Sequence, residues 1–138
     1  MRKKIGIIIV AHGSKRAQSN EEFIQLVEQI RLDNIMDFDE VKYAFLEFAN
    51  PSIEMTIEKM SAYHMDEIYV YPYFLNSGKH VVVDIPNVVS RMNETHKNVQ
   101  IKLTTHFGAS HSVPSIISSD LKRILYLSGR NDKKPLPN

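Results

Sequence analysis

The segment YVYPYFLNSGKHVVVDIP occupies residues 69–86 of the 138-residue chain and determines the predicted fold. It begins as an apolar run that is typical of a buried strand and that ends at a proline. A loop with Gly78 follows, and then come His80, an aspartate and Pro86. In α/β proteins, chemistry is placed in loops at the carboxyl ends of parallel strands. The segment therefore predicts a strand whose end leads into a functional loop.

A second strand with the same layout starts the chain. Residues 5–10 are almost continuously apolar and β-branched, which indicates a strand from Lys4 to Ala11 that is buried on both faces. This strand ends in Ala11-His12-Gly13-Ser14. The carboxyl ends of parallel strands meet at one edge of a sheet. We therefore expect His12 and His80 to lie close together.

Strand and helix patterns alternate along the rest of the chain. Further strands are predicted at residues 41–48, 67–71 and 99–103, and helices at about 20–34, from 50, from 86 and at 112–124. This alternation implies βαβ crossovers and a parallel sheet. The predicted fold is a single doubly wound α/β domain over residues 1–128, with a four-stranded parallel sheet and helices on both faces. This arrangement is similar to a flavodoxin-like half-domain. A flexible tail is predicted at 129–138, which is rich in proline and charge.

Polar residues before the apolar periods predict the helix starts. The caps that we expect are Ser19 in a capping box with Glu22, Asn50 ahead of a proline at the first helical position, Asp84 ahead of Pro86, and Ser112.

Composition excludes several classes of protein and site. The net charge of +1 gives no nucleic-acid or membrane signature. The chain has no cysteine, so it has neither disulfides nor thiolate metal ligands, and His, Asp and Glu are left as ligands for a transition metal. No apolar run approaches the roughly 20 residues that span a bilayer, and no signal-peptide pattern is seen. We expect a cytoplasmic protein.

Two imidazoles at one sheet edge would form part of a site for a divalent first-row metal ion. Two ligands are fewer than the usual three or four, so a substrate or a second subunit would have to supply the rest. His106, at the end of the last strand, is a reserve ligand. Taken alone, His12 can equally be packed at a strand end, and His80 can be an exposed loop residue.

Glu47 lies in Phe45-Leu46-Glu47-Phe48, at the same predicted edge. A carboxylate in this position can take part in proton transfer. Alternatively, Glu47 caps the second helix or pairs with a lysine. Nucleotide binding has little support, because neither G-x-G-x-x-G nor G-x-x-x-x-G-K-[ST] occurs. Ser14 has no Ser-His-Asp relay, so a hydrolase is not indicated.

Three motifs together resemble the small sirohydrochlorin chelatases of the class II chelatase group. The motifs are AHGS at 11–14, FLEFANPSI at 45–53, and YPYFL at 71–75 with Gly78, His80 and DIP at 84–86. The resemblance covers roughly residues 4–125. Members of this group insert cobalt, iron or nickel into the tetrapyrrole sirohydrochlorin. The resemblance implies a chelatase that acts without ATP, prefers Co²⁺ for cobalamin biosynthesis, and uses the metal as a substrate rather than as a tightly bound cofactor.

The resemblance also assigns roles to residues. His12 and His80 would be the metal-binding and catalytic pair, and Glu47 would be a further catalytic residue. For the substrate we expect an apolar wall formed by Tyr73, Phe74 and Leu75. The expected set of donors is Ser14, Lys15, Asn76, Ser77, Gly78 and Lys79.

Larger relatives hold two such domains, and the short form that this chain resembles assembles as a homodimer with the cleft between subunits. Iron or nickel insertion into the same substrate is an alternative activity. A rival from another class is a non-catalytic carrier of metal or tetrapyrrole, which would bind its cargo without turnover. A response-regulator-like domain is disfavoured, because the first strand ends in His-Gly-Ser rather than in an acidic cluster.

Overall fold

The computed structural model describes residues 2–34 and 37–130 of the chain. These residues fall into two compact units, one up to Gly108 and one from Ala109 onward, which are described separately. The first, called the sheet unit here, contains β1 (Ile5–Ala11), α1 (Ala17–Leu32), β2 (Glu40–Phe45), α2 (Ile53–Ala62), β3 (Glu67–Pro72), a π-helical turn (His80–Asp84), α3 (Ile85–Thr95) and β4 (Gln100–Leu103). The second contains α4 (Ser112–Leu127).

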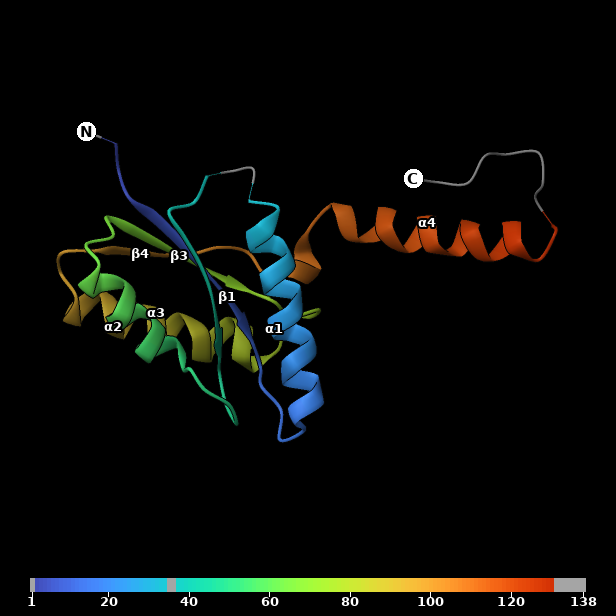
Figure 1. Ribbon diagram of the computed structural model, residues 1–138. Helices are drawn as coiled ribbons and strands as arrows, with labels where there is room; N and C mark the ends of the chain where they lie inside the picture. Colours follow the sequence, from blue (N-terminus) through green and yellow to red (C-terminus); the bar gives the residue numbers. More distant parts are fainter. Residues whose placement is uncertain (1, 35–36, 131–138) are drawn as a thin grey trace. The chain divides into compact units, whose positions relative to one another are not determined.

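All strand pairs of the sheet are parallel, in the order β2-β1-β3-β4. The central strand β1 pairs with β2 and β3, so that Ala11 lies opposite Phe45 and Val10 opposite Pro72. Figure 1 shows the sheet between α1 on one side and α2 and α3 on the other. The predicted four-stranded parallel sheet with helices on both faces is confirmed. Its registers bring the carboxyl ends of β1, β2 and β3 to one edge.

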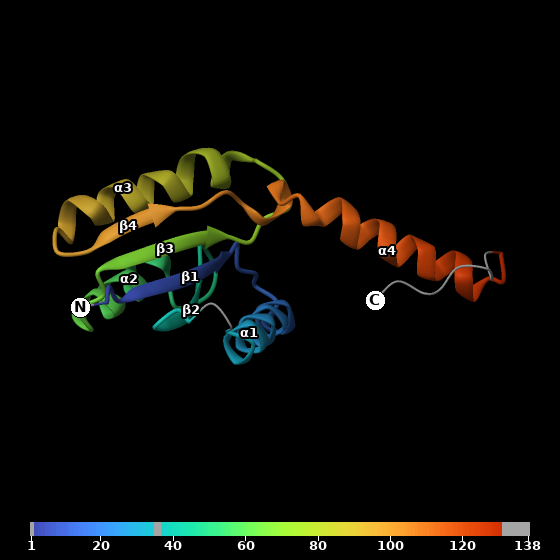
Figure 2. The same ribbon diagram turned by 90° about the horizontal axis from the view of Figure 1, so that it is seen from above.

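Alternate residues of β1 contribute to two different apolar layers. Ile8 and Val10 are fully buried in the larger layer, against side chains of α2 and α3 such as Ile57 and Val88. Ile9 points the other way, into a smaller layer with Phe23 of α1. Figure 2 shows these two helices, α1 and α3, on opposite sides of the sheet. Burial on both faces explains why β1 is almost uniformly apolar.

The predicted capping box of the first helix is wrong. Helix α1 begins at Ala17, with Arg16 as its N-cap and no side-chain capping bond. The polar side chain of Asn20 serves the preceding loop instead. It accepts a hydrogen bond from the Ser14 N–H at 2.9 Å and donates one to the Ser14 carbonyl at 2.7 Å. The loop after β1 is therefore fastened to the first turn of α1, and the helix starts before Ser19.

Two further cap predictions are also wrong. Helix α2 is capped by Ser52, whose hydroxyl accepts the Met55 N–H at 3.1 Å, and not by Asn50. The reason is that the Pro51 carbonyl accepts the Phe45 N–H at 2.9 Å, so this segment still belongs to the sheet edge. In α4, Ser112 is the first helical residue rather than the cap. Pro86 lies in the first turn of α3, as predicted.

Only Gly129 and Arg130 of the predicted tail are described, and residues 131–138 lie outside the described part. The N–H groups of Gly129 and Arg130 donate to the carbonyls of Tyr126 and Leu125 and so close the carboxyl end of α4. None of the helices within 2–34 and 37–130 is long and apolar enough to cross a membrane. The predicted domain limits and cytoplasmic location stay predictions.

Candidate metal centre

The loop after β2 is held against the end of β1 by backbone hydrogen bonds. The Leu46 N–H donates to the Ala11 carbonyl at 2.9 Å, and the Glu47 N–H donates to the His12 carbonyl at 2.8 Å. The predicted extension of this strand to Phe48 is wrong, because β2 ends at Phe45 and Phe48 has a φ of 65°. The pairing with β1 nevertheless continues far enough to fix Glu47 beside His12.

Gly13 allows this close approach. Its φ is +93°, which disfavours residues with a side chain, and a Cβ added to it would lie 1.8 Å from the Glu47 carbonyl oxygen. The His12-Gly13 pair of the AHGS motif is thus explained by geometry. The histidine supplies the imidazole, and the glycine lets the backbone of Glu47 pass next to it.

His80 does not lie in a loop, as the sequence suggested, but begins the π-helical turn His80–Asp84 that runs directly into α3. The predicted capping role of Asp84 is wrong as well, since α3 has no side-chain capping bond. Asp84 Oδ2 lies 2.7 Å from His80 Nδ1 instead. The turn therefore pairs a histidine with a carboxylate four residues later.

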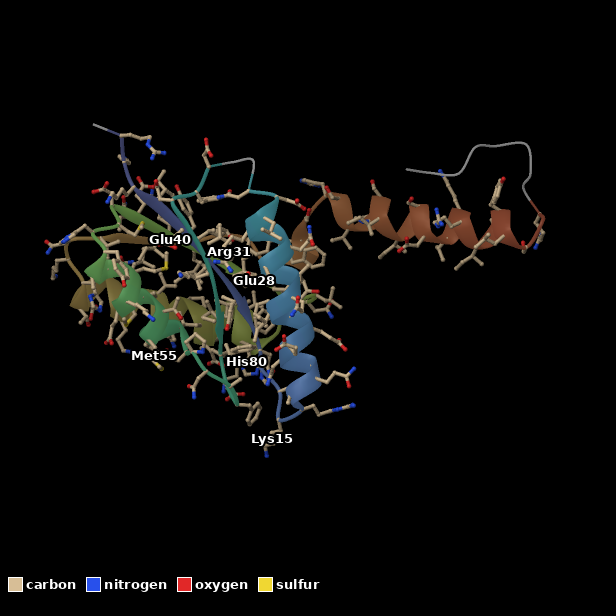
Figure 3. All side chains as sticks on the ribbon, in the orientation of Figure 1. Lys15, Glu28, Arg31, Glu40, Met55 and His80 are labelled. Atoms are coloured by element: carbon tan, nitrogen blue, oxygen red, sulfur yellow. The ribbon has the colours of Figure 1, made fainter. Side chains whose placement is uncertain are left out.

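His12, Glu47 and His80 converge at the carboxyl edge of the sheet. Each offers one ligand atom, and these atoms all lie within 4.8 Å of one another. The two imidazole rings are 4.7 Å apart between centroids, and His12 Nε2 is 3.0 Å from Glu47 Oε2. Both histidines are half-buried and Glu47 is exposed. In Figure 3, His80 lies at the same end of the sheet unit as Lys15, which follows β1.

The hydrogen bonds fix which ring nitrogens face the centre. His12 Nδ1 is 2.9 Å from the Gly13 carbonyl, which can only accept, so Nδ1 carries the proton. The same reasoning applies to His80 Nδ1 beside the Asp84 carboxylate. Both Nε2 atoms are then the unprotonated nitrogens, which could ligate a metal ion. His12 Nε2 and Glu47 Oε2 would repel each other as two acceptors, so a proton or a cation belongs between them.

Aromatic side chains surround His12. Phe48 and Phe74 have ring centroids 5.7 Å and 6.5 Å from the His12 ring, and Lys15 Nζ lies 5.4 Å above the Phe48 ring. Phe48 is 58% exposed, which is unusual for phenylalanine. We did not predict a role for Phe48 from the sequence, although it lies in the same motif as Glu47.

The other predicted site residues are spread over the surface around this edge. The Tyr73 ring is stacked on Phe23 at 5.7 Å, and the Ser14 hydroxyl accepts the Arg16 N–H at 3.0 Å. The remaining residues of the predicted wall and donor set are exposed, namely Leu75, Asn76, Ser77, Gly78 and Lys79. The reserve ligand His106 does not belong to the group of three ligands.

Comparisons with known proteins identify relatives of the chain. The model of the CbiX family matches residues 6–124. A sirohydrochlorin cobaltochelatase of Sulfurisphaera tokodaii is 29% identical over 126 residues, which is 91% of this chain and 98% of that protein. The chloroplastic sirohydrochlorin ferrochelatase of Arabidopsis thaliana is 27% identical over 87% of this chain and 52% of its own length. The sirohydrochlorin chelatase SirB of Bacillus subtilis subspecies spizizenii, solved in complex with cobalt, has the same fold, with a TM-score of 0.77 at 24% identity over 88% of this chain and 51% of that chain.

Proposed function

Because the chain belongs to the CbiX family, we propose that it is a sirohydrochlorin chelatase, a lyase that inserts a divalent metal ion into this tetrapyrrole without ATP. The observation that carries the proposal is the cluster of His12, Glu47 and His80, in which two ring nitrogens and a carboxylate oxygen lie within 4.8 Å of one another. This donor set suits a divalent first-row metal ion. One side of the cluster is open, because Glu47 is exposed.

Metal insertion exchanges two protons for one ion. The tetrapyrrole loses two pyrrole N–H protons, while the ion exchanges its water and protein ligands for four ring nitrogens. We propose that His12, Glu47 and His80 hold the incoming ion and then accept the released protons. The 3.0 Å contact between His12 and Glu47 fits this exchange, since it requires either a cation or a proton between its two atoms.

We propose Co²⁺ as the physiological metal, in cobalamin biosynthesis, since the Sulfurisphaera relative is named a cobaltochelatase. Iron insertion is the second candidate and is favoured by the name of the Arabidopsis relative. Nickel is a third. Imidazole and carboxylate ligands bind all three ions, and metal supply often decides among them.

We propose that the tetrapyrrole lies over the open side of the cluster, against the rings of Phe48 and Phe74. Its carboxylates need cationic and hydroxyl donors. The candidates are the exposed Lys15, Lys79 and Ser77 and the half-buried Ser14, with Tyr73, Leu75, Asn76 and Gly78 beside them.

We also propose that two copies of the chain assemble as a homodimer around the substrate. Length supports this proposal, because the chain covers 98% of the Sulfurisphaera relative but 51% of SirB, so that the matched part of two copies corresponds to one SirB chain. Phe48 and Leu75 are large apolar side chains that are 58% and 66% exposed. A partner subunit or a substrate could bury them.

The test is a chelation assay with the purified chain, sirohydrochlorin and Co²⁺, Fe²⁺ or Ni²⁺. The proposal predicts that the absorption change of metal insertion is faster than in a protein-free control and continues over many turnovers. No acceleration with any of the three metals would refute it. A change that stops at one equivalent per site would instead indicate a carrier.

A further inference from the structure

We infer that Asp84 is a positioning residue, which holds His80 in the tautomer that presents Nε2 to the metal ion. This inference deepens the proposed function and depends on it for the identity of the metal site. The observation behind it is the 2.7 Å contact between Asp84 Oδ2 and His80 Nδ1. It assigns to Asp84 a task in place of the helix cap that the sequence suggested.

The π-helical turn sets the geometry of this pair. Single π turns inside helices are rare and often lie at functional sites. Here the turn spans His80–Asp84 and passes into α3, with Ile85 fully buried at the junction. Both side chains of the pair are about one-third exposed, His80 at 38% and Asp84 at 32%. Asp84 is the residue before α3, but its carboxylate lies beside the imidazole and makes no capping bond to the helix.

The chemistry follows from donor and acceptor roles. A free neutral imidazole carries its proton mainly on Nε2. The Asp84 carboxylate accepts a hydrogen bond from Nδ1–H and so favours the tautomer with the proton on Nδ1. Carboxylates behind metal-binding histidines fix the ring and raise the basicity of the ligating nitrogen, and their loss typically weakens metal binding 10- to 100-fold. His12 has a different arrangement, because its Nδ1 faces the Gly13 carbonyl. A side-chain substitution can therefore test His80 alone.

The direct test is long-range ¹H–¹⁵N NMR of protein labelled with ¹⁵N-histidine at pH 8, with His80 assigned by its loss in His80→Gln. We expect His80 to carry its proton on Nδ1 in the natural chain and on Nε2 in Asp84→Ala, with His12 unchanged. The control Glu94→Ala removes an exposed carboxylate from the same helix, α3, and should leave His80 as it is. A His80 proton on Nε2 in the natural chain, or no change in Asp84→Ala, would overturn the inference.

The second readout is the affinity for Co²⁺ alone, followed by its visible absorption in the same three proteins. Asp84→Ala should bind Co²⁺ about 10- to 100-fold more weakly than Glu94→Ala, at an unchanged melting temperature. Equal affinities would overturn the inference. Neither readout uses the tetrapyrrole, so a chain that shows the tautomer change but fails to metallate sirohydrochlorin would refute the proposed function and leave the role of Asp84 standing.

Discussion

Gly13 is the residue at which the backbone after β1 passes closest to the loop that carries Glu47. Its positive φ of 93° and the 1.8 Å approach of an added Cβ to the Glu47 carbonyl leave no room for a side chain. Gly13→Ala should therefore lower the free energy of unfolding by about 1–3 kcal/mol and separate Glu47 from His12. Chemical denaturation measures the first effect, and Co²⁺ affinity the second.

The matched control is Gly78→Ala, because a Cβ there would meet nothing within 4 Å. This variant should be as stable as the natural chain or slightly more stable. If both variants had equal stabilities, the close contact at Gly13 would not be required.

His12 lies at the centre of the site, where its imidazole ring is next to the side chains of Glu47, His80 and Phe74. His12→Ala should lower the rate of metal insertion by about 100-fold or more, since both a ligand and a proton acceptor are lost. Steady-state absorption kinetics measure the rate. The control His111→Ala removes an exposed histidine that is not in the group of three ligands and should keep the natural rate. Near-normal turnover in His12→Ala would reject the role given to His12.

At the scale of elements, β3 begins with a charged group, Glu67, that is 5% exposed. Its carboxylate accepts hydrogen bonds from Lys3 at 2.9 Å, Lys102 at 3.3 Å and the Tyr69 hydroxyl at 3.1 Å. These bonds, that from Lys3 above all, lower the pKa of Glu67 from 4.5 to about 2. The network joins the amino-terminal segment, β3 and β4 at the edge of the sheet opposite the metal centre.

This lowered pKa predicts how stability depends on pH. A group that is more acidic in the folded chain stabilises it fully above pH 4.5, and this contribution is lost as the pH falls from 4.5 towards 2. In Glu67→Gln, the free energy of unfolding should therefore decline less over this range than in the natural chain. Denaturation at a series of pH values measures the decline. Parallel curves for the natural chain and Glu67→Gln would contradict the prediction, and the exposed Glu94→Gln serves as the control.

The ends of β1 and β3 could be predicted from the sequence much better than the helix caps could. Strands buried on both faces are uniformly apolar, so β1 was placed to within one residue and β3 likewise. The predicted caps of α1 and α2 were wrong because polar groups near the start of each helix are hydrogen-bonded elsewhere. Asn20 bonds the loop at Ser14, and Pro51 bonds Phe45 across the sheet edge. The prediction that Asp84 caps α3 was also wrong. The π-helical turn, which cannot be inferred from residue spacing, places the Asp84 carboxylate beside His80.

At the scale of the whole molecule, topology explains why part of the site was predictable. Histidines that follow parallel neighbouring strands must emerge at one edge, so the meeting of His12 and His80 could be inferred without coordinates. The contact between the Phe48 and His12 rings could not be inferred, because it depends on the positive φ of Phe48 in the turn after Glu47. The wall and donor residues stay proposals, because their roles depend on a bound tetrapyrrole.

The proposed homodimer predicts the mass of the particle in solution. Light scattering after gel filtration should give twice the chain mass of 15.9 kDa. If the interface covers the exposed apolar groups near the cluster, Leu75→Lys should lower the mass towards that of one chain, because it places a charge in the interface. The exposed Met55→Lys, on α2, is the matched control and should remain dimeric. A natural chain that stays monomeric at high concentration would contradict the proposal.

The measurement that tests the central claim most directly is anomalous X-ray diffraction at the cobalt edge from crystals soaked in Co²⁺. We predict one cobalt ion bonded to His12 Nε2, His80 Nε2 and a Glu47 carboxylate oxygen, each at about 2.1 Å. Cobalt bound elsewhere on the chain, with these three side chains uncoordinated, would contradict the account.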